Sequence, residues 1–284
     1  MNAEPNPARD RRRRILKKIG QYALLTFLAA VVLFPIYITI VSSLLTPAQI
    51  SRQPPTLFPT HPQFSSYSAA WSGAHFDTYL KNSFIVTIVI TAGQVITAIL
   101  AGYAFAFLRF PFKRTLFVVF LATLMIPFEV TVVQNLTTMV DLGLYDTYAA
   151  LALPFLATGF GAFLLRQAFL SIPRDLEDAA ALDGYGHWRF LWRVAVPLAR
   201  PAIAALGVFA FLTAWNQYLW PLLVTRDDRL RTVQIGLRQL RAASIDQVNV
   251  TFAGVVIAVI PLAVLLIIFQ KQLIRGLTTG AVKG

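Results

Sequence analysis

The residues whose types and spacing could bind a partner lie in one polar island between two long apolar stretches. Pro173 suits the first turn of a helix, where its missing N–H costs nothing, and the carboxylates after it lie near the positive helix end. Ala179, Ala180 and Asp183 share one side of this helix, which is small enough for another surface to approach closely. Gly184 is suited to end the helix in the left-handed conformation. This pattern predicts close docking to another surface.

A second helical stretch follows the glycine. Its apolar stripe consists of Trp188, Leu191, Trp192 and Ala195, and Pro197 and Pro201 then end the pattern. Residues 171–200 are therefore expected to form a helix-turn-helix knob. The alternative is an amphipathic loop that has no partner.

Four polar side chains lie in or near apolar stretches that are long enough to cross a membrane: Glu129, Asn135, Asn216 and Gln217. An ionisable group in such a stretch is costly and generally faces water or protein. Glu129 is therefore a candidate for lining a passage, and the alternative is a structural carboxyl near the outer interface. The three amides are able to bind a hydroxylated solute or to tie helices together.

No set of residues fits a known catalytic or metal site. The chain has no Gly-x-x-x-x-Gly-Lys-Ser/Thr phosphate loop, no Gly-x-Ser-x-Gly elbow, no His-Glu-x-x-His and no cysteine. The three histidines, His61, His75 and His187, are expected on different sides of the membrane and cannot share a metal. We therefore expect no catalytic residue, no bound metal and no cofactor in this chain.

Membrane helices are the elements expected to hold these residues. Of the 284 residues, 57% are hydrophobic and 13% are charged, which is too apolar for a soluble protein. Apolar stretches predict six spans, at residues 20–43, 82–108, 115–140, 147–165, 201–225 and 247–270. Backbone polar groups in a bilayer must be paired within their own segment, so the predicted fold class is all-α. The spans with Pro127, Pro221 and Pro261 are candidates for a moving lining.

Basic residues are distributed unevenly between the two sides. With the N-terminus inside, eighteen Lys and Arg fall on the inner side and seven on the outer side, so both termini and the knob are expected to be cytoplasmic. The net charge of +12 then reflects topology and not nucleic-acid binding. The expected domains are a disordered basic cytoplasmic leader at 1–19, a six-helix domain at 20–275 and a cytoplasmic tail at 276–284.

The polar island resembles the signature loop of importer-type ABC permeases, which docks in a groove of an ATPase subunit. That signature reads Glu-Ala-Ala, three residues, Gly, nine residues, Ile-x-Leu-Pro. Here Asp178 replaces Glu, and Val194 and Val196 replace Ile and Leu, with the glycine and the proline in register. The resemblance implies that the ATPase-coupling residues are Asp178, Ala179, Ala180, Asp183, Gly184 and Pro197.

The C-terminal tail resembles the Arg-Gly-Leu-Thr-x-Gly-Ala-Val-Lys-Gly ending of permeases in the carbohydrate-uptake branch, the group of the maltose permease subunits. This resemblance implies that the tail reaches into an ATPase dimer through Gly276, Thr279, Gly280 and Lys283. The alternative is an ordinary frayed end. Together with the docking loop and the six-span layout, the resemblance covers nearly the whole chain.

The resemblance implies the smaller permease subunit of a binding-protein-dependent ABC importer in the bacterial inner membrane, working by alternating access. Its implied partners are a second permease subunit, an ATPase dimer that binds ATP and Mg, an extracytoplasmic solute-binding protein and membrane lipid. The runs 126–129 and 215–223 are most similar to permeases for glycerol-3-phosphate and glycerophosphodiesters. A di- or oligosaccharide is the alternative solute.

Two further classes of protein are less consistent with the residues. An ion-coupled secondary transporter needs ionisable relays within its spans, where only Glu129 qualifies. A membrane-embedded enzyme needs a clustered nucleophile or metal set, which is missing. The five arginines at 226–241 are able either to attract an anion or to help dock a binding protein.

Overall fold

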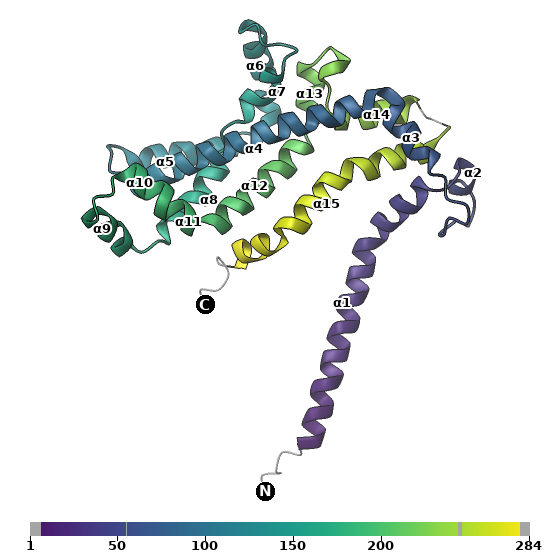
Figure 1. Cartoon of the computed structure of the whole chain (residues 1–284), viewed down its shortest axis with the longest axis horizontal. Helices are drawn as coiled ribbons and strands as arrows, with labels where there is room; N and C mark the ends of the chain where they lie inside the picture. The colour runs from purple at the N-terminus through teal and green to yellow at the C-terminus, as the bar shows by residue number, and fades with distance from the viewer. Residues whose placement is uncertain (1–6, 55, 244–245, 279–284) are drawn as a thin grey trace. The chain divides into compact units, whose positions relative to one another are not determined.

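All regular secondary structure in the described part of the chain is helical. The computed structural model describes residues 7–54, 56–243 and 246–278, and these ranges contain no strand. In order, the elements (Figure 1) are α1 (Pro7–Ser43), α2 (Pro47–Ile50), α3 (Ser65–Ser72), η1 (Gly73–His75), α4 (Phe76–Ala106), α5 (Lys113–Ala122), η2 (Thr123–Met125), α6 (Phe128–Asp141), α7 (Tyr148–Ala152), η3 (Leu153–Phe155), α8 (Gly159–Leu170), α9 (Arg174–Leu182), α10 (His187–Phe190), η4 (Leu191–Ala195), α11 (Val196–Leu198), α12 (Arg200–Trp215), α13 (Leu219–Val224), η5 (Asp228–Leu230), α14 (Val233–Ala243) and α15 (Val248–Thr278).

The described residues fall into two compact units, and α15 takes part in both. The first unit holds α1 and the short helices after it, together with the start of α15. Within it, the amide of Asn249 donates to the Ser66 hydroxyl at 2.8 Å, and the hydroxyls of Ser43 and Tyr67 lie 2.7 Å apart. These buried or half-buried bonds join the end of α1 and the start of α15 to α3.

Helix α1 begins at Pro7, so residues 7–19 are helical and not the disordered leader that the sequence predicts. Once a long apolar segment has nucleated a helix, adding residues to its end is inexpensive, which explains the extension. Residues 1–6 lie outside the described residues. The second span likewise begins at Phe76, earlier than the predicted residue 82.

The second unit is built on α4, which packs along α8 and α12 (Figure 1). Glycines permit this close packing. A Cβ on Gly102 would lie 2.9 Å from the backbone nitrogen of Arg166, and one on Gly161 would lie 3.0 Å from Cβ of Ala98. Small residues at such crossings allow membrane helices to approach each other closely.

Three helices are each long and apolar enough to cross a membrane: Ile15–Ser43, Phe76–Ala106 and Val248–Gln272. Three bent pairs pass the same test only when each pair is taken together. They are Lys113–Met125 with Phe128–Asp141 (97°), Tyr148–Phe155 with Gly159–Leu170 (47°) and His187–Leu198 with Arg200–Trp215 (79°). The described residues thus hold three to six candidate spans.

Two of the predicted spans are interrupted by proline. Pro127 disfavours a helical conformation at Ile126, which is extended at φ −86° and ψ 112°, so the predicted span 115–140 breaks there. In the predicted span 201–225, α12 ends at Trp215 and α13 begins at Leu219. Pro221 would clash with the carbonyl four residues earlier in a continuous helix, and the break removes that clash. Helix α15 continues through its own proline.

Candidate functional site

The polar island forms two short helices, α9 and α10, near the end of α4 where α5 begins (Figure 1). Pro173 is the N-cap of α9 and so lies just outside its first turn. Gly184 has φ +76°, the left-handed conformation that the sequence predicts. Its N–H donates to the carbonyl of Ala181 at 3.0 Å, and the N–H of Tyr185 donates to that of Ala180 at 2.8 Å. These two bonds form a Schellman motif that fixes the turn.

The two alanines of the island do not share an outer face. Ala180 is buried against the rest of the protein, whereas Ala179 is exposed, because neighbouring residues on a helix point about 100° apart. Asp178 and Asp183 are exposed with Ala179. The expectation that both alanines form the docking face is therefore wrong for Ala180.

The outer surface of the knob carries large apolar side chains, one of which, Leu182, the sequence does not single out. Leu182 is 90% exposed, and Trp188 is 66% exposed. In the sequence, Leu182 is two residues before the helix-ending glycine, and this position was the signal that its side chain could be exposed. Exposed apolar groups of this size favour a protein surface as the partner of the knob.

The inner face of the knob is packed onto the ends of α4 and α8. Ala180 and Phe190 belong to one buried cluster with Tyr103 and Phe169. The ring of Phe190 meets that of Phe107 edge-on at 5.3 Å. The knob is therefore joined to α4 and α8 through packed aromatic contacts.

Pro197 does not end the second stretch as the sequence predicts. The π-helix η4 follows α10, and Pro197 lies within the next short helix, α11. The 79° bend comes after Leu198, and Pro201 occupies the first turn of α12. The wide π turn also splits the predicted stripe: Leu191 and Ala195 are buried, whereas Trp188 and Trp192 are exposed.

Glu129 and Asn135 both lie on α6. Glu129 is in the first turn, directly after the break, and is exposed, so its carboxylate is close to the positive helix end. Asn135 is half-buried. Among the described residues, neither side chain makes a hydrogen bond or an ion pair. The structure therefore does not join Glu129 or Asn135 to Asn216 or Gln217.

Asn216 and Gln217 lie at the break between α12 and α13. The amide of Asn216 donates to the carbonyl of Leu212 at 2.8 Å, and its oxygen accepts from Gln234 on α14 at 3.3 Å. Asn216 therefore ties helices together. The side-chain oxygen of Gln217 is buried and has no partner within the described part of the chain.

A buried amide that the sequence analysis missed anchors the loop between α13 and α14. Asn82 donates to the carbonyls of Arg229 at 2.8 Å and Arg231 at 2.9 Å. Its oxygen accepts from the Tyr148 hydroxyl at 2.5 Å. The start of α4 is therefore fixed to this loop and to α7.

A second anchor holds the beginning of the same loop. Asp146, at φ +61°, accepts from the backbone N–H groups of Arg226 at 2.8 Å and Asp227 at 3.1 Å. The backbone N–H of Arg229 holds the pKa of Asp227 below its ordinary value. Both anchors bind backbone atoms, so they set the path of the loop without using its arginine side chains.

Helix α14 lies against the start of α4 by virtue of a glycine. A Cβ on Gly236 would come within 2.5 Å of the Tyr79 ring, so a larger residue cannot fit without movement. The opposite face of α14 carries Gln234 and Arg238 in successive turns. Arg238 donates to the hydroxyl of Tyr218, at the break beside Gln217.

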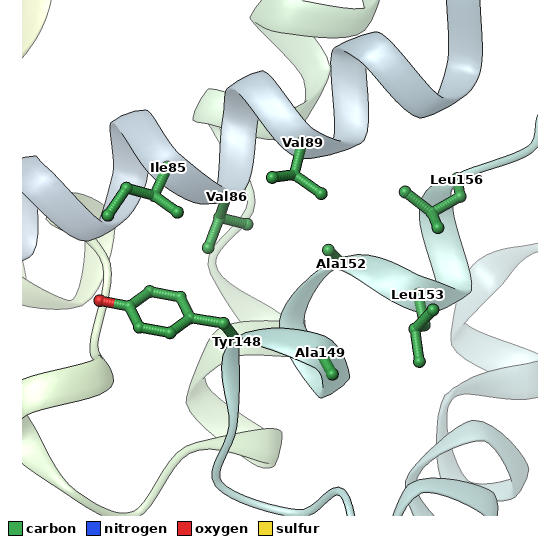
Figure 2. A pocket seen from close by; sticks show the side chains of 8 residues that line it. All are labelled: Ile85, Val86, Val89, Tyr148, Ala149, Ala152, Leu153 and Leu156. Atoms are coloured by element: carbon green, nitrogen blue, oxygen red, sulfur yellow. The ribbon is translucent and has the colours of Figure 1, made fainter. Parts of the chain in front are cut away.

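One pocket of about 210 Å³ lies between α4 and the α7–η3 segment, and Figure 2 shows its lining. The lining side chains are Ile85, Val86, Val89, Tyr148, Ala149, Ala152, Leu153 and Leu156. Their one polar group, the Tyr148 hydroxyl, is already bonded to Asn82. This pocket therefore suits an acyl chain or an apolar side chain better than a charged or hydroxylated solute.

Of the four predicted tail contacts, one lies within the described residues. Gly276 lies in the last turns of α15. Thr279, Gly280 and Lys283 lie outside the described residues.

Comparison with known proteins identifies the family. Residues 94–279 match the model for the binding-protein-dependent transport system inner membrane component. The sn-glycerol-3-phosphate transport system permease protein UgpE of Rhizobium meliloti (strain 1021) is 38% identical over 94% of this chain and 97% of its own length. UgpE of Brucella abortus (strain 2308) is 38% identical over 87% of this chain and 91% of its own, and UgpE of Agrobacterium fabrum is 36% identical over 93% and 97%.

A crystal structure supports the fold. A chain of a bacterial ABC transporter involved in the import of the acidic polysaccharide alginate has a TM-score of 0.80 and 24% identity, covering 92% of this chain and 97% of its own. The family match, the relatives and the apolar helices lead to one conclusion: this chain belongs to the binding-protein-dependent transport system inner membrane components, the permeases of ABC importers, and is a multi-pass protein of the inner membrane.

Proposed function

We propose that this chain forms half of the passage of an importer for sn-glycerol 3-phosphate or a glycerophosphodiester. The observation that carries this proposal is the similarity, over nearly the whole chain, to relatives named as permeases for sn-glycerol 3-phosphate. A di- or oligosaccharide is the second candidate solute. The chain would not hydrolyse ATP itself, and a partner ATPase would supply that reaction.

The proposed arrangement is six spans with both termini in the cytoplasm. Helix α4 supports it, because Tyr79 meets α14 near one end and Tyr103 meets the knob near the other. These residues are 24 positions apart, about 36 Å along a helix, which exceeds the thickness of the hydrocarbon layer. The excess of basic residues on the side of the knob supports a cytoplasmic knob and an α14 on the outer side.

We infer that the knob docks on the ATPase. Its outer surface exposes the apolar side chains of Leu182 and Trp188 together with Ala179, where a partner backbone could approach closely. Its buried side is packed onto α4 and α8. Closure of an ATPase dimer against the outer surface would therefore tilt these helices and open the passage in turn to each side of the membrane.

The proposed assembly contains a second permease subunit, two ATPase subunits and a solute-binding protein. The C-terminal tail would contact the ATPase dimer. The chain has no native cysteine, so a single Thr279→Cys variant gives a direct cross-linking test. Absence of a cross-link in every nucleotide state, together with full transport after truncation behind Arg275, would exclude this contact.

The decisive experiment for the solute is uptake into proteoliposomes that contain the complete transporter. ATP-dependent import of labelled sn-glycerol 3-phosphate, with its binding protein present, is the expected result. Maltose and maltotriose serve as competing solutes with their own binding proteins. Import of a saccharide without import of any phosphoester would overturn the assignment.

A further inference from the structure

The five arginines between residues 226 and 241 are not equivalent. Two of them form ion pairs within the loop: Arg229 Nε lies 3.3 Å from Asp227, and Arg231 lies 2.6 Å from Asp228. Within the described residues, the guanidinium of Arg238 has no carboxylate partner. Its positive charge is therefore available to a ligand.

The guanidinium of Arg238 is held in place by an aromatic residue. It donates to the hydroxyl of Tyr218 and lies 5.8 Å from the centre of the same ring. Cation–π contact and the hydrogen bond together restrict a side chain that would otherwise be flexible. An arginine has five N–H donors, so most of them remain free after this one bond.

Tyr218 offers a further donor. Its hydroxyl oxygen accepts from Arg238, and its own proton has no acceptor among the described residues. An anion placed beside this pair would thus receive charge-assisted N–H bonds and one O–H bond, the combination that suits phosphate oxygens. At the neighbouring position, the unpaired buried oxygen of Gln217 is an acceptor, which a hydroxyl group would satisfy.

We propose that Arg238 and Tyr218 bind the phosphate of the solute as it enters the passage, at the break between α12 and α13. This inference rests on the proposed function, and it assigns specificity for phosphoesters to two residues of this subunit. The fold supports the role of this position. Gln234, one turn away on α14, bonds to the carbonyl of Trp215 at 3.4 Å, so α14 is attached to the break that carries the site.

The test uses the complete reconstituted transporter with labelled sn-glycerol 3-phosphate. Arg238→Gln removes the charge, and we expect the maximal uptake rate to fall at least tenfold. The concentration of loaded binding protein that gives half-maximal uptake, and ATP hydrolysis without solute, should stay unchanged. Tyr218→Phe should lower uptake by a smaller factor, and Arg238→Lys should fall between Arg238→Gln and the native protein because lysine lacks the planar fork.

Arg226→Gln is the matched control. Arg226 is exposed on the loop that leads to α14, and its side chain makes no ion pair within the described residues. Uptake by this variant should remain at the native level. An equal loss in both variants would assign the effect to the general positive field of the loop and overturn the proposed site.

Other outcomes separate the alternatives. If Arg238→Gln raises the half-maximal concentration of binding protein and leaves the maximal rate unchanged, Arg238 docks the binding protein and the inference is wrong. A lipid headgroup is the other phosphate source, so the ratio of variant to native uptake is also measured in vesicles of phosphate-free glucosyl and galactosyl diacylglycerol. A ratio that returns to one in these vesicles would overturn the solute assignment, whereas an unchanged ratio supports it.

Different results would contradict the proposed function and the proposed phosphate site. If the native transporter imports no phosphoester, the proposed function fails. If it imports sn-glycerol 3-phosphate and Arg238→Gln imports it equally well, only the site assignment fails. Should Arg238→Gln not assemble, Arg238→Lys and Tyr218→Phe decide the matter, since native uptake by both would contradict the inference.

Discussion

The hydroxyl of Tyr103 lies 3.2 Å from Nδ1 of His187, which connects the end of α4 to the first residue of α10. This bond is the polar part of the contact between the knob and the membrane helices. Aromatic rings and aliphatic side chains make the apolar part of that contact. Substitution of either Tyr103 or His187 therefore tests how strongly movement of the knob is coupled to movement of α4.

Tyr103→Phe should loosen coupling without preventing assembly, because the ring contacts remain. A typical hydrogen bond contributes about 1 kcal/mol, so the number of ATP molecules hydrolysed per imported solute should rise about fivefold. His187→Ala should give a similar rise, and the double variant should add little more. Tyr185→Phe is the control, since its hydroxyl has no hydrogen bond among the described residues. Additive effects would show that the two groups act separately.

The alanine pair on α9 allows a matched test of docking. Ala179 is exposed, so Ala179→Trp should leave the permease folded but prevent the ATPase from binding, as measured by pull-down of the purified complex. Ala180 is buried, so Ala180→Trp should overpack the cluster and lower the free energy of unfolding by about 1–3 kcal/mol. Normal ATPase binding by Ala179→Trp would remove α9 from the interface.

Gly184 tests the turn itself. A Cβ at this position meets no atom within 4 Å, so Gly184→Ala would be strained only through its positive φ, at a cost of about 1–2 kcal/mol. We expect weaker solute-stimulated ATP hydrolysis with normal membrane insertion. Gly186→Ala, also in open space but at negative φ, should behave like the native protein. Equal activity of both variants would show that the turn geometry is unimportant.

The packing of α4 against α8 depends on Gly102. A Cβ there would lie within 3.1 Å of backbone atoms on α8, so Gly102→Ala should lower the yield and the melting temperature of the complex. Gly207→Ala on α12 is the control, because its nearest contact would be at 3.9 Å. This control should be neutral or slightly stabilising, as expected for alanine in a helix. Equal yields for the two variants would contradict the close approach.

Glu129→Gln separates a passage-lining carboxylate from a structural one. The side chain is exposed and has no partner among the described residues, so the substitution should alter transport while yield stays close to native. Loss of its charge from the first turn of α6 should cost no more than about 1 kcal/mol. Asp141→Asn, at the other end of α6, is the control. A parallel fall in yield and thermal stability would indicate a structural pairing instead.

Local chemistry made parts of the site predictable. Gly184 adopts positive φ, as expected for the residue that ends a helix and suffers no Cβ clash. Pro127 marks a point where a span could bend, but the sequence predicts a continuous span there and the structure has a break at Ile126. The 97° angle at that break could not be predicted, since it depends on how α6 packs against α13, for example through the contact between Phe128 and Trp220 at 6.0 Å.

Tertiary contacts decided the remaining features. Ala179 and Ala180 are chemically identical, and only the buried cluster makes one of them face inward. Asn82 gave no signal because the carbonyls that it binds lie 147 and 149 positions further along the chain. Arg238 was one of five similar arginines until its bond to Tyr218, and the ion pairs of Arg229 and Arg231, distinguished it.

Helix α4 is fixed at both ends, by Asn82 to the loop after α13 and by Tyr103 to the knob. Its 31 residues make a rod of about 46 Å. If such a rod pivots about its middle, a tilt of about 10° shifts each end by about 4 Å, in opposite directions. Four ångströms is more than the diameter of a water molecule. A small rocking of one helix would therefore be enough to close a file of water on one side while admitting it on the other.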